Sequence, residues 1–105
     1  MNRSTVTISA HMAELLDDAA LTLDELARCA RLEPDWIATH VRAGVLQPAS
    51  GDSTMEWRFA STTIVRARRV AELEHVYDAD PQLAALATDL MEEVAALRQQ
   101  LRGLD

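Results

Sequence analysis

The sequence predicts a mainly α-helical fold with a small β-wing, followed by one long C-terminal helix. Three observations indicate it: a strong helix start at 21–26, two short apolar runs around a turn-rich stretch within 45–59, and a heptad pattern after Pro81. The chain has 105 residues, of which 49% are apolar, enough for one small domain with an appended element. We therefore expect a winged helix-turn-helix-like domain over 1–79 and a coiled-coil-like helix over 80–105.

The first predicted helix carries a full N-terminal signature. Thr22 can cap the helix, and Glu25, three residues later, can reach back to the cap. Leu21 and Leu26 have the spacing of a hydrophobic staple, in which an apolar residue before the cap packs on the first turn. These residues predict a helix that starts directly after Thr22.

A second short helix is expected after a tight turn at 31–33. Pro34 is suited to the first position of a helix, where its missing N–H is not needed, and Gly44 is suited to a left-handed C-terminal end. Two helices of about two to three turns joined by so short a turn form a helix-turn-helix arrangement.

Residues 45–59 are predicted to form a wing of two short strands around the turn-rich stretch 49–53. Trp57 and Phe59 alternate with a charged residue, so both rings should face one side and anchor the wing to the helices. Residues 4–9 are rich in β-branched residues and alternate apolar Val6 and Ile8 with polar side chains, which predicts a short N-terminal strand that can add to the wing. Residues 11–20 remain ambiguous between a helix and a turn.

Two longer helices are expected after the wing. The first, over 62–77, has apolar residues around most of its circumference and should be buried on more than one side. Those apolar residues are Ile64, Ala67, Val70, Ala71, Leu73 and Tyr77. Its polar stripe consists of Arg68, Glu72 and His75. Asp80 is then the expected cap, and Pro81 the first residue, of a helix that continues to about residue 102.

The last helix has the clearest periodicity of the chain, an apolar seam with spacings of four and three that continues to Leu104. We expect two copies to dimerise through this seam. It consists of Leu83, Ala87, Leu90, Val94, Leu97 and Leu101. Acids occupy the first part of the helix and Arg98 and Arg102 its end, so the charge order favours an antiparallel pair. The alternative is a helix that folds back on its own domain.

The charge of the chain bears on its partners. Ten arginines and seventeen acids give a net charge of -7. Residues 22–59 contain four arginines and six acids, whereas a DNA-binding module commonly makes on the order of 6–10 phosphate contacts with basic residues. The charge therefore disfavours DNA binding, although a local cluster of Arg66, Arg68 and Arg69 leaves it open as an alternative.

Other residue types restrict the function further. The single Cys29 excludes an internal disulfide, favours a cytoplasmic location, and is expected to be a small core residue. No apolar run approaches the roughly 20 residues of a membrane span. His11, His40 and His75 are scattered and are interpreted as solvated or capping residues. We expect no metal, no cofactor and no enzyme activity.

Several motifs resemble two related families. The order of short helix, turn, short helix, wing and longer helices looks like the N-terminal domain of MerR-type regulators, and 43–48 is similar to the segment after their second helix. The chain departs from those regulators at Ile37–His40 and Glu56–Phe59, where they contact DNA. The departures match the chaperone modulator CbpM family better. Its motifs are similar to Leu23–Cys29, Gly44–Pro48, Trp57–Phe59 and Leu83–Leu101 of this chain, and the resemblance spans about residues 20–102.

The resemblance implies a protein that binds the J-domain of a CbpA/DnaJ-type co-chaperone and inhibits its stimulation of Hsp70. Because such J-domains present a basic helix, an acidic surface of this chain would be attracted to it. We predict this acidic surface around the first helices, and it consists of Asp17, Asp18, Asp24, Glu25 and Asp35. A second acidic group, at Glu72, Glu74, Asp78 and Asp80, is the next candidate. The other hypotheses are a MerR-like transcriptional regulator that binds DNA and a purely structural dimerisation module.

Overall fold

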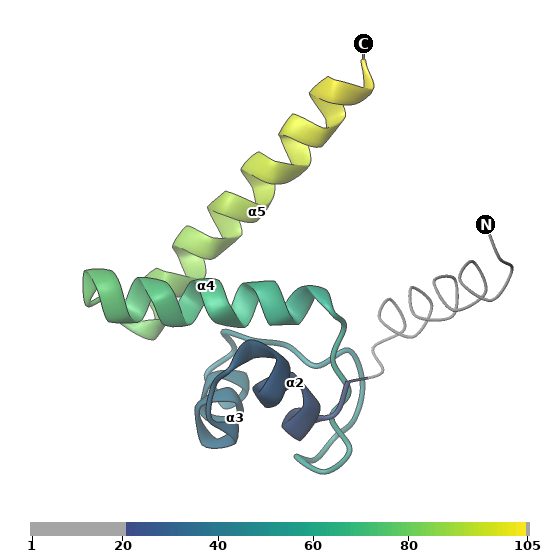
Figure 1. Cartoon of the computed structure of the whole chain (residues 1–105), viewed down its shortest axis with the longest axis vertical. Helices are drawn as coiled ribbons and strands as arrows, with labels where there is room; N and C mark the ends of the chain where they lie inside the picture. Colours follow the sequence, from purple (N-terminus) through teal and green to yellow (C-terminus); the bar gives the residue numbers. More distant parts are fainter. Residues whose placement is uncertain (1–20, 105) are drawn as a thin grey trace, which may run out of the picture. The chain divides into compact units, whose positions relative to one another are not determined.

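The computed structural model describes residues 21–104 and is mainly helical, as the sequence predicts (Figure 1). Its helices are α2 (Leu23–Ala30), α3 (Pro34–Arg42), α4 (Thr62–Tyr77) and α5 (Pro81–Gly103). The predicted strand at 4–9, the ambiguous segment 11–20, and with it Asp17 and Asp18, lie outside the described residues.

α2 starts where the sequence predicts because its cap is complete. The backbone N–H of Glu25 donates to Thr22 Oγ1 at 3.1 Å, and the backbone N–H of Thr22 donates to Glu25 Oε1 at 2.9 Å. The two hydrogen bonds satisfy donors that a helix start otherwise leaves without a partner. Leu21, just before the cap, packs against the core cluster that contains Leu26.

A left-handed residue turns the chain between α2 and α3. Arg31 has φ 60° and ψ 44°, and its N–H donates to the carbonyls at the end of α2. Pro34 then opens α3, and Gly44 follows its end with φ 79°. The sequence thus predicted the limits of both short helices correctly.

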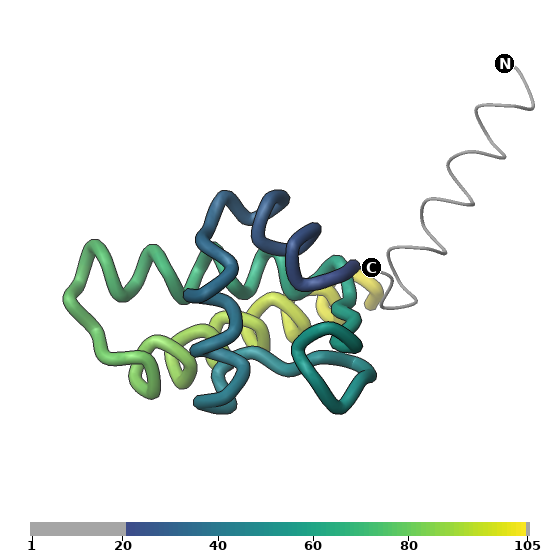
Figure 2. The backbone as a smooth tube through the Cα atoms, turned by 90° about the horizontal axis from the view of Figure 1, so that it is seen from below, coloured from purple at the N-terminus to yellow at the C-terminus, as the bar shows by residue number. Residues whose placement is uncertain are grey.

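The predicted β-wing is wrong as a pair of strands. Among the described residues, segment 45–59 makes only isolated antiparallel bridges, between Ser50 and Arg58 and between Leu21 and Phe59. The pairing stays short for two reasons. At one end, Pro48 has no N–H to donate. At the other end, the chain turns at Ser53, whose carbonyl accepts from two backbone N–H groups. Figure 2 follows this segment as an open loop between α3 and α4.

The aromatic residues of this loop nevertheless anchor it, as predicted. Phe59 is fully buried and Trp57 is nearly so, and both belong to the core cluster with Leu26 and Ile37. Their ring centroids lie 6.2 Å apart with an interplanar angle of 77°, an edge-to-face contact. The bridge between Leu21 and Phe59 fixes the base of the loop to the start of α2, through hydrogen bonds of 3.1 and 2.8 Å.

α4 has the bounds that the sequence predicts, and its polar stripe at Arg68, Glu72 and His75 is exposed. Ala67 and Val70 are buried, but Tyr77 is exposed and the prediction that it is buried is wrong. Tyr77 is the last helical residue, where the chain turns away through Asp78 with φ 56°. A side chain at such an end has no following turn to cover it.

α5 begins as predicted, since Asp80 Oδ1 accepts from the N–H of Leu83 at 2.8 Å and Pro81 follows as the first residue. The described chain divides into two compact units, which separate after Arg68, so α4 contributes to both. In the second unit Val70 of α4 is buried, as are Ala84, Ala85 and Thr88 of α5. The predicted domain boundary between residues 79 and 80 stays a prediction.

Candidate functional site

Three residues of the predicted acidic surface lie in first turns of helices. Asp24 and Glu25 belong to the first turn of α2, and Asp35 belongs to the first turn of α3. All three are exposed. Carboxylates are favoured at helix starts because the positive end of the helix dipole lies there, so local stability and surface charge both explain these residues.

Glu25 is engaged within its own helix. The hydrogen bond from the backbone N–H of Thr22 is the largest cause that lowers the pKa of the Glu25 carboxyl, followed by the hydrogen bond with the Thr22 side chain. Nearby Arg28 and Arg58 lower this pKa further. Its carboxylate is therefore a capping group first, and a weaker candidate for partner contact than Asp24.

A shallow groove of about 480 Å³ brings Asp24 together with Glu33, an acid absent from the predicted surface. Its other lining residues are Ala27, Arg28, Leu32 and Pro34, while Asp35 does not line it. Glu33 is the N-cap of α3, and its side chain makes no capping hydrogen bond. The sequence signal for Glu33 was its position directly before Pro34, which marks it as the N-cap of α3. Because the turn between the helices is short, this cap lies next to α2.

The outer side of α3 carries few basic groups. His40 is buried, which corrects the interpretation of this histidine as solvated or capping. Its Nδ1 lies 2.8 Å from the Trp36 carbonyl oxygen, and its ring stacks on the Trp36 ring at 3.6 Å. The spacing of four residues places the two rings on one helix face, a signal that the sequence already contained. Arg42 is the only arginine of α3.

Cys29 is exposed, and the prediction of a small core residue is wrong. In α2 the buried residues are Leu26, Ala27 and Ala30. Their face is narrow, and Cys29 lies roughly 110° from its centre if successive residues are separated by about 100°. Neighbouring apolar residues therefore did not show that Cys29 is buried.

The three arginines of the predicted cluster make different contacts. Arg66 donates from Nε to the Val45 carbonyl at 2.9 Å, and so fixes the segment after α3 to α4. Arg68 is exposed on the polar stripe of α4. Arg69 lines a groove with residues of α5. The three side chains serve three different places.

The predicted dimerisation seam is largely exposed in the single chain. Exposed members include Leu90 at 60% and Leu101 at 63%, and Ala87 is half-buried. Leu86 and Met91 beside the seam are also exposed. A continuous apolar face of this length is unusual for a helix with no partner.

Within residues 21–104, neither a metal site nor a membrane-spanning helix is found. No three His, Cys, Asp or Glu side chains there are grouped to hold a metal ion. None of its helices is both long and apolar enough to cross a membrane.

The fold and these sites define a small, mainly helical protein with acidic helix starts and a long helix that exposes its apolar side. Proteins named chaperone modulatory protein CbpM resemble it closely enough to assign a family. Those of Pseudomonas entomophila and Pseudomonas putida are each 31% identical over 80 residues, 76% of this chain and 78% of theirs. The one from Coxiella burnetii is 28% identical over 85 residues, 81% of this chain and 79% of its own.

The chain belongs to the CbpM family, as its motifs predict. In each comparison, the alignment covers more than three quarters of this chain and of the relative. None of the known family models matches the chain, and no solved structure matches it.

Proposed function

We propose that the protein is a cytoplasmic chaperone modulator that binds the J-domain of a CbpA/DnaJ-type co-chaperone and inhibits its stimulation of Hsp70. Membership of the CbpM family is the observation that carries this proposal, because the relatives are named as chaperone modulatory proteins. That name describes a modulator rather than an enzyme. The residues of the first unit support a contact surface of matching charge.

The candidate contact is the groove between the starts of α2 and α3. Asp24 and Glu33 are exposed on it, and Leu32 and Pro34 give it apolar walls. A basic helix can place its charged groups on these acids and its aliphatic stems on the apolar walls. The net charge of -7 adds attraction at distances up to roughly 8 Å at physiological salt.

DNA binding is not favoured as the alternative. The helix that would enter a groove of DNA, α3, carries one arginine and Asp35 in its first turn. Arg66 is engaged with the Val45 carbonyl, so it is poorly placed to contact phosphate. The helix-turn-helix-like arrangement of α2 and α3 is therefore proposed as a scaffold for protein contact.

Binding to the J-domain can be measured by interferometry at two salt concentrations, with the J-domain of the same organism immobilised. We expect Asp24→Lys with Glu33→Lys to slow association and to flatten its salt dependence, because rim charges act mainly on the association rate. The control is Asp52→Lys with Glu56→Lys, an equal charge change on the exposed loop. The triple variant Asp17→Lys, Asp18→Lys and Asp35→Lys tests the rest of the predicted acidic surface except Glu25, which caps α2.

The same proteins can be added to Hsp70 with its J-domain partner while ATP hydrolysis is recorded. We expect the wild-type chain to reduce the stimulated rate and leave the basal rate of Hsp70 unchanged. Failure of the folded wild-type chain to bind the J-domain would overturn the proposal. Equal effects of the groove and loop variants would exclude the groove as the contact site but would leave the proposed J-domain partner in place.

We also propose that two copies associate through the seam on α5. The exposed leucines that recur every seven residues along α5 support this proposal. A second helix that covers them would stabilise the pair by removing apolar surface from water. The orientation of the two copies is a separate question.

A further inference from the structure

The second unit contains a groove whose charge differs from that of the whole chain. This arginine groove measures about 390 Å³ and is formed by residues of α4 and α5. Its lining combines two arginines with four apolar residues and includes no acid: Arg69, Leu90, Met91, Val94, Ala95 and Arg98. The chain itself has seventeen acids and a net charge of -7. The arginine groove is therefore a local positive region in an acidic protein.

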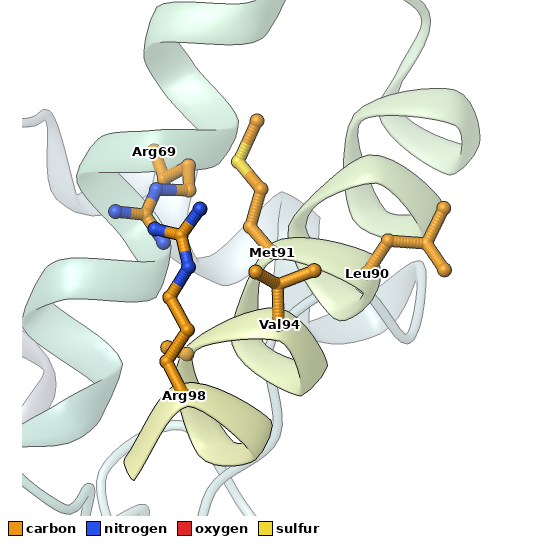
Figure 3. A pocket seen from close by; sticks show the side chains of 6 residues that line it. Arg69, Leu90, Met91, Val94 and Arg98 are labelled. Atoms are coloured by element: carbon orange, nitrogen blue, oxygen red, sulfur yellow. The ribbon is translucent and has the colours of Figure 1, made fainter. Parts of the chain in front are cut away.

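The two arginines reach the groove from different helices. Arg69 belongs to α4 and Arg98 to α5, and Figure 3 shows their guanidinium groups pointing toward each other. Two like charges at this place repel each other, whereas a carboxylate between them would be stabilised by both through charge-assisted hydrogen bonds. A guanidinium also presents a planar set of N–H donors that matches the geometry of a carboxylate. The arginine groove therefore suits an anionic group.

The acids in the second half of α5 lie on other sides of the helix. Successive residues are separated by about 100° around a helix axis, so Asp89 lies roughly 180° from Arg98. Glu92 and Glu93 lie roughly 120° and 140° from it. Glu72 of α4 is exposed and does not line the groove either. The part of the chain that the structure describes thus places no carboxylate in the arginine groove.

The apolar lining indicates what kind of ligand carries the anion. Leu90 is 60% exposed and Val94 is 45% exposed, so the groove is an open surface. Small molecules are usually bound in cavities that bury about 70–90% of their surface, which favours a larger ligand here. Residues 90–98 extend over about 12 Å of α5, roughly two turns of a second helix. An amphipathic helix can lay its apolar side in such a groove, and the flexible Met91 can adapt to it.

We propose that the arginine groove binds an acidic amphipathic helix of another protein. A glutamate or aspartate of that helix lies between Arg69 and Arg98, and its apolar side chains cover the apolar lining. The groove of the first unit, with Asp24 and Glu33, has the opposite charge and is proposed above to receive a basic helix. One chain thus offers separate surfaces to a basic and to an acidic partner. This inference does not depend on the proposed J-domain contact.

The experiment measures binding of a fluorescent helical peptide of about 15 residues, with leucines on one side and glutamates beside them, by anisotropy. We expect Arg69→Gln and Arg98→Gln each to weaken binding by about three- to fivefold, because an exposed ion pair is lost. The matched controls are Arg68→Gln, the exposed neighbour on α4, and Arg102→Gln, whose arginine donates to Gln99 on α5. Both controls should bind the peptide like wild type.

Further arms test the anion and its source. The same peptide with glutamine in place of glutamate should bind weakly, and it should not distinguish the arginine variants from wild type. In NMR spectra, the Nε–H signals of Arg69 and Arg98 should shift with the acidic peptide, whereas acetate and inorganic phosphate should shift them only at much higher concentration. J-domain binding of both arginine variants should equal that of wild type, which keeps the two proposals separable.

The results decide the proposal as follows. Weaker peptide binding by the two groove variants alone, with shifted Arg69 and Arg98 signals, supports it. Equal weakening by all four arginine variants would reveal unspecific attraction and overturn it, as would a wild-type chain that does not bind the peptide. Acetate or phosphate binding as tight as the peptide overturns the helical partner. If both groove variants also sediment differently from wild type without peptide, the arginines act through assembly, and direct contact is overturned.

Discussion

The first unit and α5 use the same apolar residue types in opposite ways. In the first unit, Leu26, Leu46 and Phe59 are fully buried within one chain. In α5, Leu90, Leu97 and Leu101 remain exposed, although α5 is the longest helix and has a regular apolar face. The comparison shows that apolar periodicity alone does not reveal whether a helix face is covered within the chain.

Helix length explains part of the difference. α2 and α3 have 8 and 9 residues, and isolated helices below roughly 12–15 residues are marginal in water. They exist because they pack on each other and on the aromatic loop. α5 has 23 residues and a complete Asp80 cap, so it depends less on side-chain burial. Its free face is available for contact with another molecule.

The largest expected effect of a single substitution lies in the core of the first unit. Phe59→Ala and Trp57→Ala should each lower the free energy of unfolding by about 3–5 kcal/mol, through lost burial and a remaining cavity. Met55→Ala in the same loop is the control, because Met55 is 89% exposed. Urea unfolding gives the three values. If Trp57→Ala unfolds like wild type but loses J-domain binding, Trp57 is a contact residue and its anchoring role is wrong.

Substitution of apolar residues on the seam of α5 should affect association and not folding. Leu90→Asp with Leu97→Asp would place charges in a desolvated interface, at a cost to dimerisation of about 3–5 kcal/mol. Sedimentation should then detect monomers, while the melting temperature of dilute protein changes little because both leucines are exposed in the single chain. An unchanged dimer would place the interface elsewhere and remove the contrast between the two regions.

The helix caps should have similar, smaller effects in both regions. Thr22→Ala removes the cap of α2, and Asp80→Ala removes the hydrogen bond to the N–H of Leu83. Each should cost about 1 kcal/mol. Thr22→Ser and Asp80→Asn keep an acceptor and serve as controls. Because α2 is short, Thr22→Ala should destabilise the whole first unit in urea, whereas Asp80→Ala should mainly fray α5, as measured by amide hydrogen exchange.

The smallest expected effect is the pH dependence from Glu25. Its pKa is lowered in the folded state, so its contribution is fully present above the unfolded value of about 4.3 and is lost as the pH falls through the folded pKa. Glu25→Gln should therefore reduce the loss of stability between neutral pH and acid. The comparison uses urea midpoints across that range. A Glu25→Gln variant with the same acid sensitivity as wild type would show that the cap between Thr22 and residue 25 does not require the charged carboxylate.

Local signals in the sequence were sufficient for much of the fold. Thr22 with Glu25, Pro34, Gly44 and Asp80 defined helix ends correctly because caps and turns depend on neighbouring residues. The wing failed as a pair of strands because ladder formation requires partners for successive backbone groups. Cys29 and Tyr77 failed because burial at the flank or the end of a helix depends on what lies opposite.

The candidate sites were predictable in kind but not in arrangement. Charge favoured a protein partner, yet the pairing of Asp24 with Glu33 across one groove required α2 and α3 to be placed together. Likewise, Glu25 had the sequence signature of a cap, and the structure adds that its carboxylate is held there. The dimerisation seam remains a prediction of the sequence, which the exposed leucines support.

By itself the sequence determined the helices, their caps, the aromatic anchors and the family, because each depends on residue type and on spacing along the chain. Only the tertiary structure decided which side chains are covered. It placed Arg66 on the Val45 carbonyl and Arg69 in a groove with Arg98. Arg66 and Arg69 lie only three positions apart in the sequence, whereas Arg98 belongs to a different helix. The physical reason is that burial and charge pairing depend on distances between elements, which the three-dimensional packing sets.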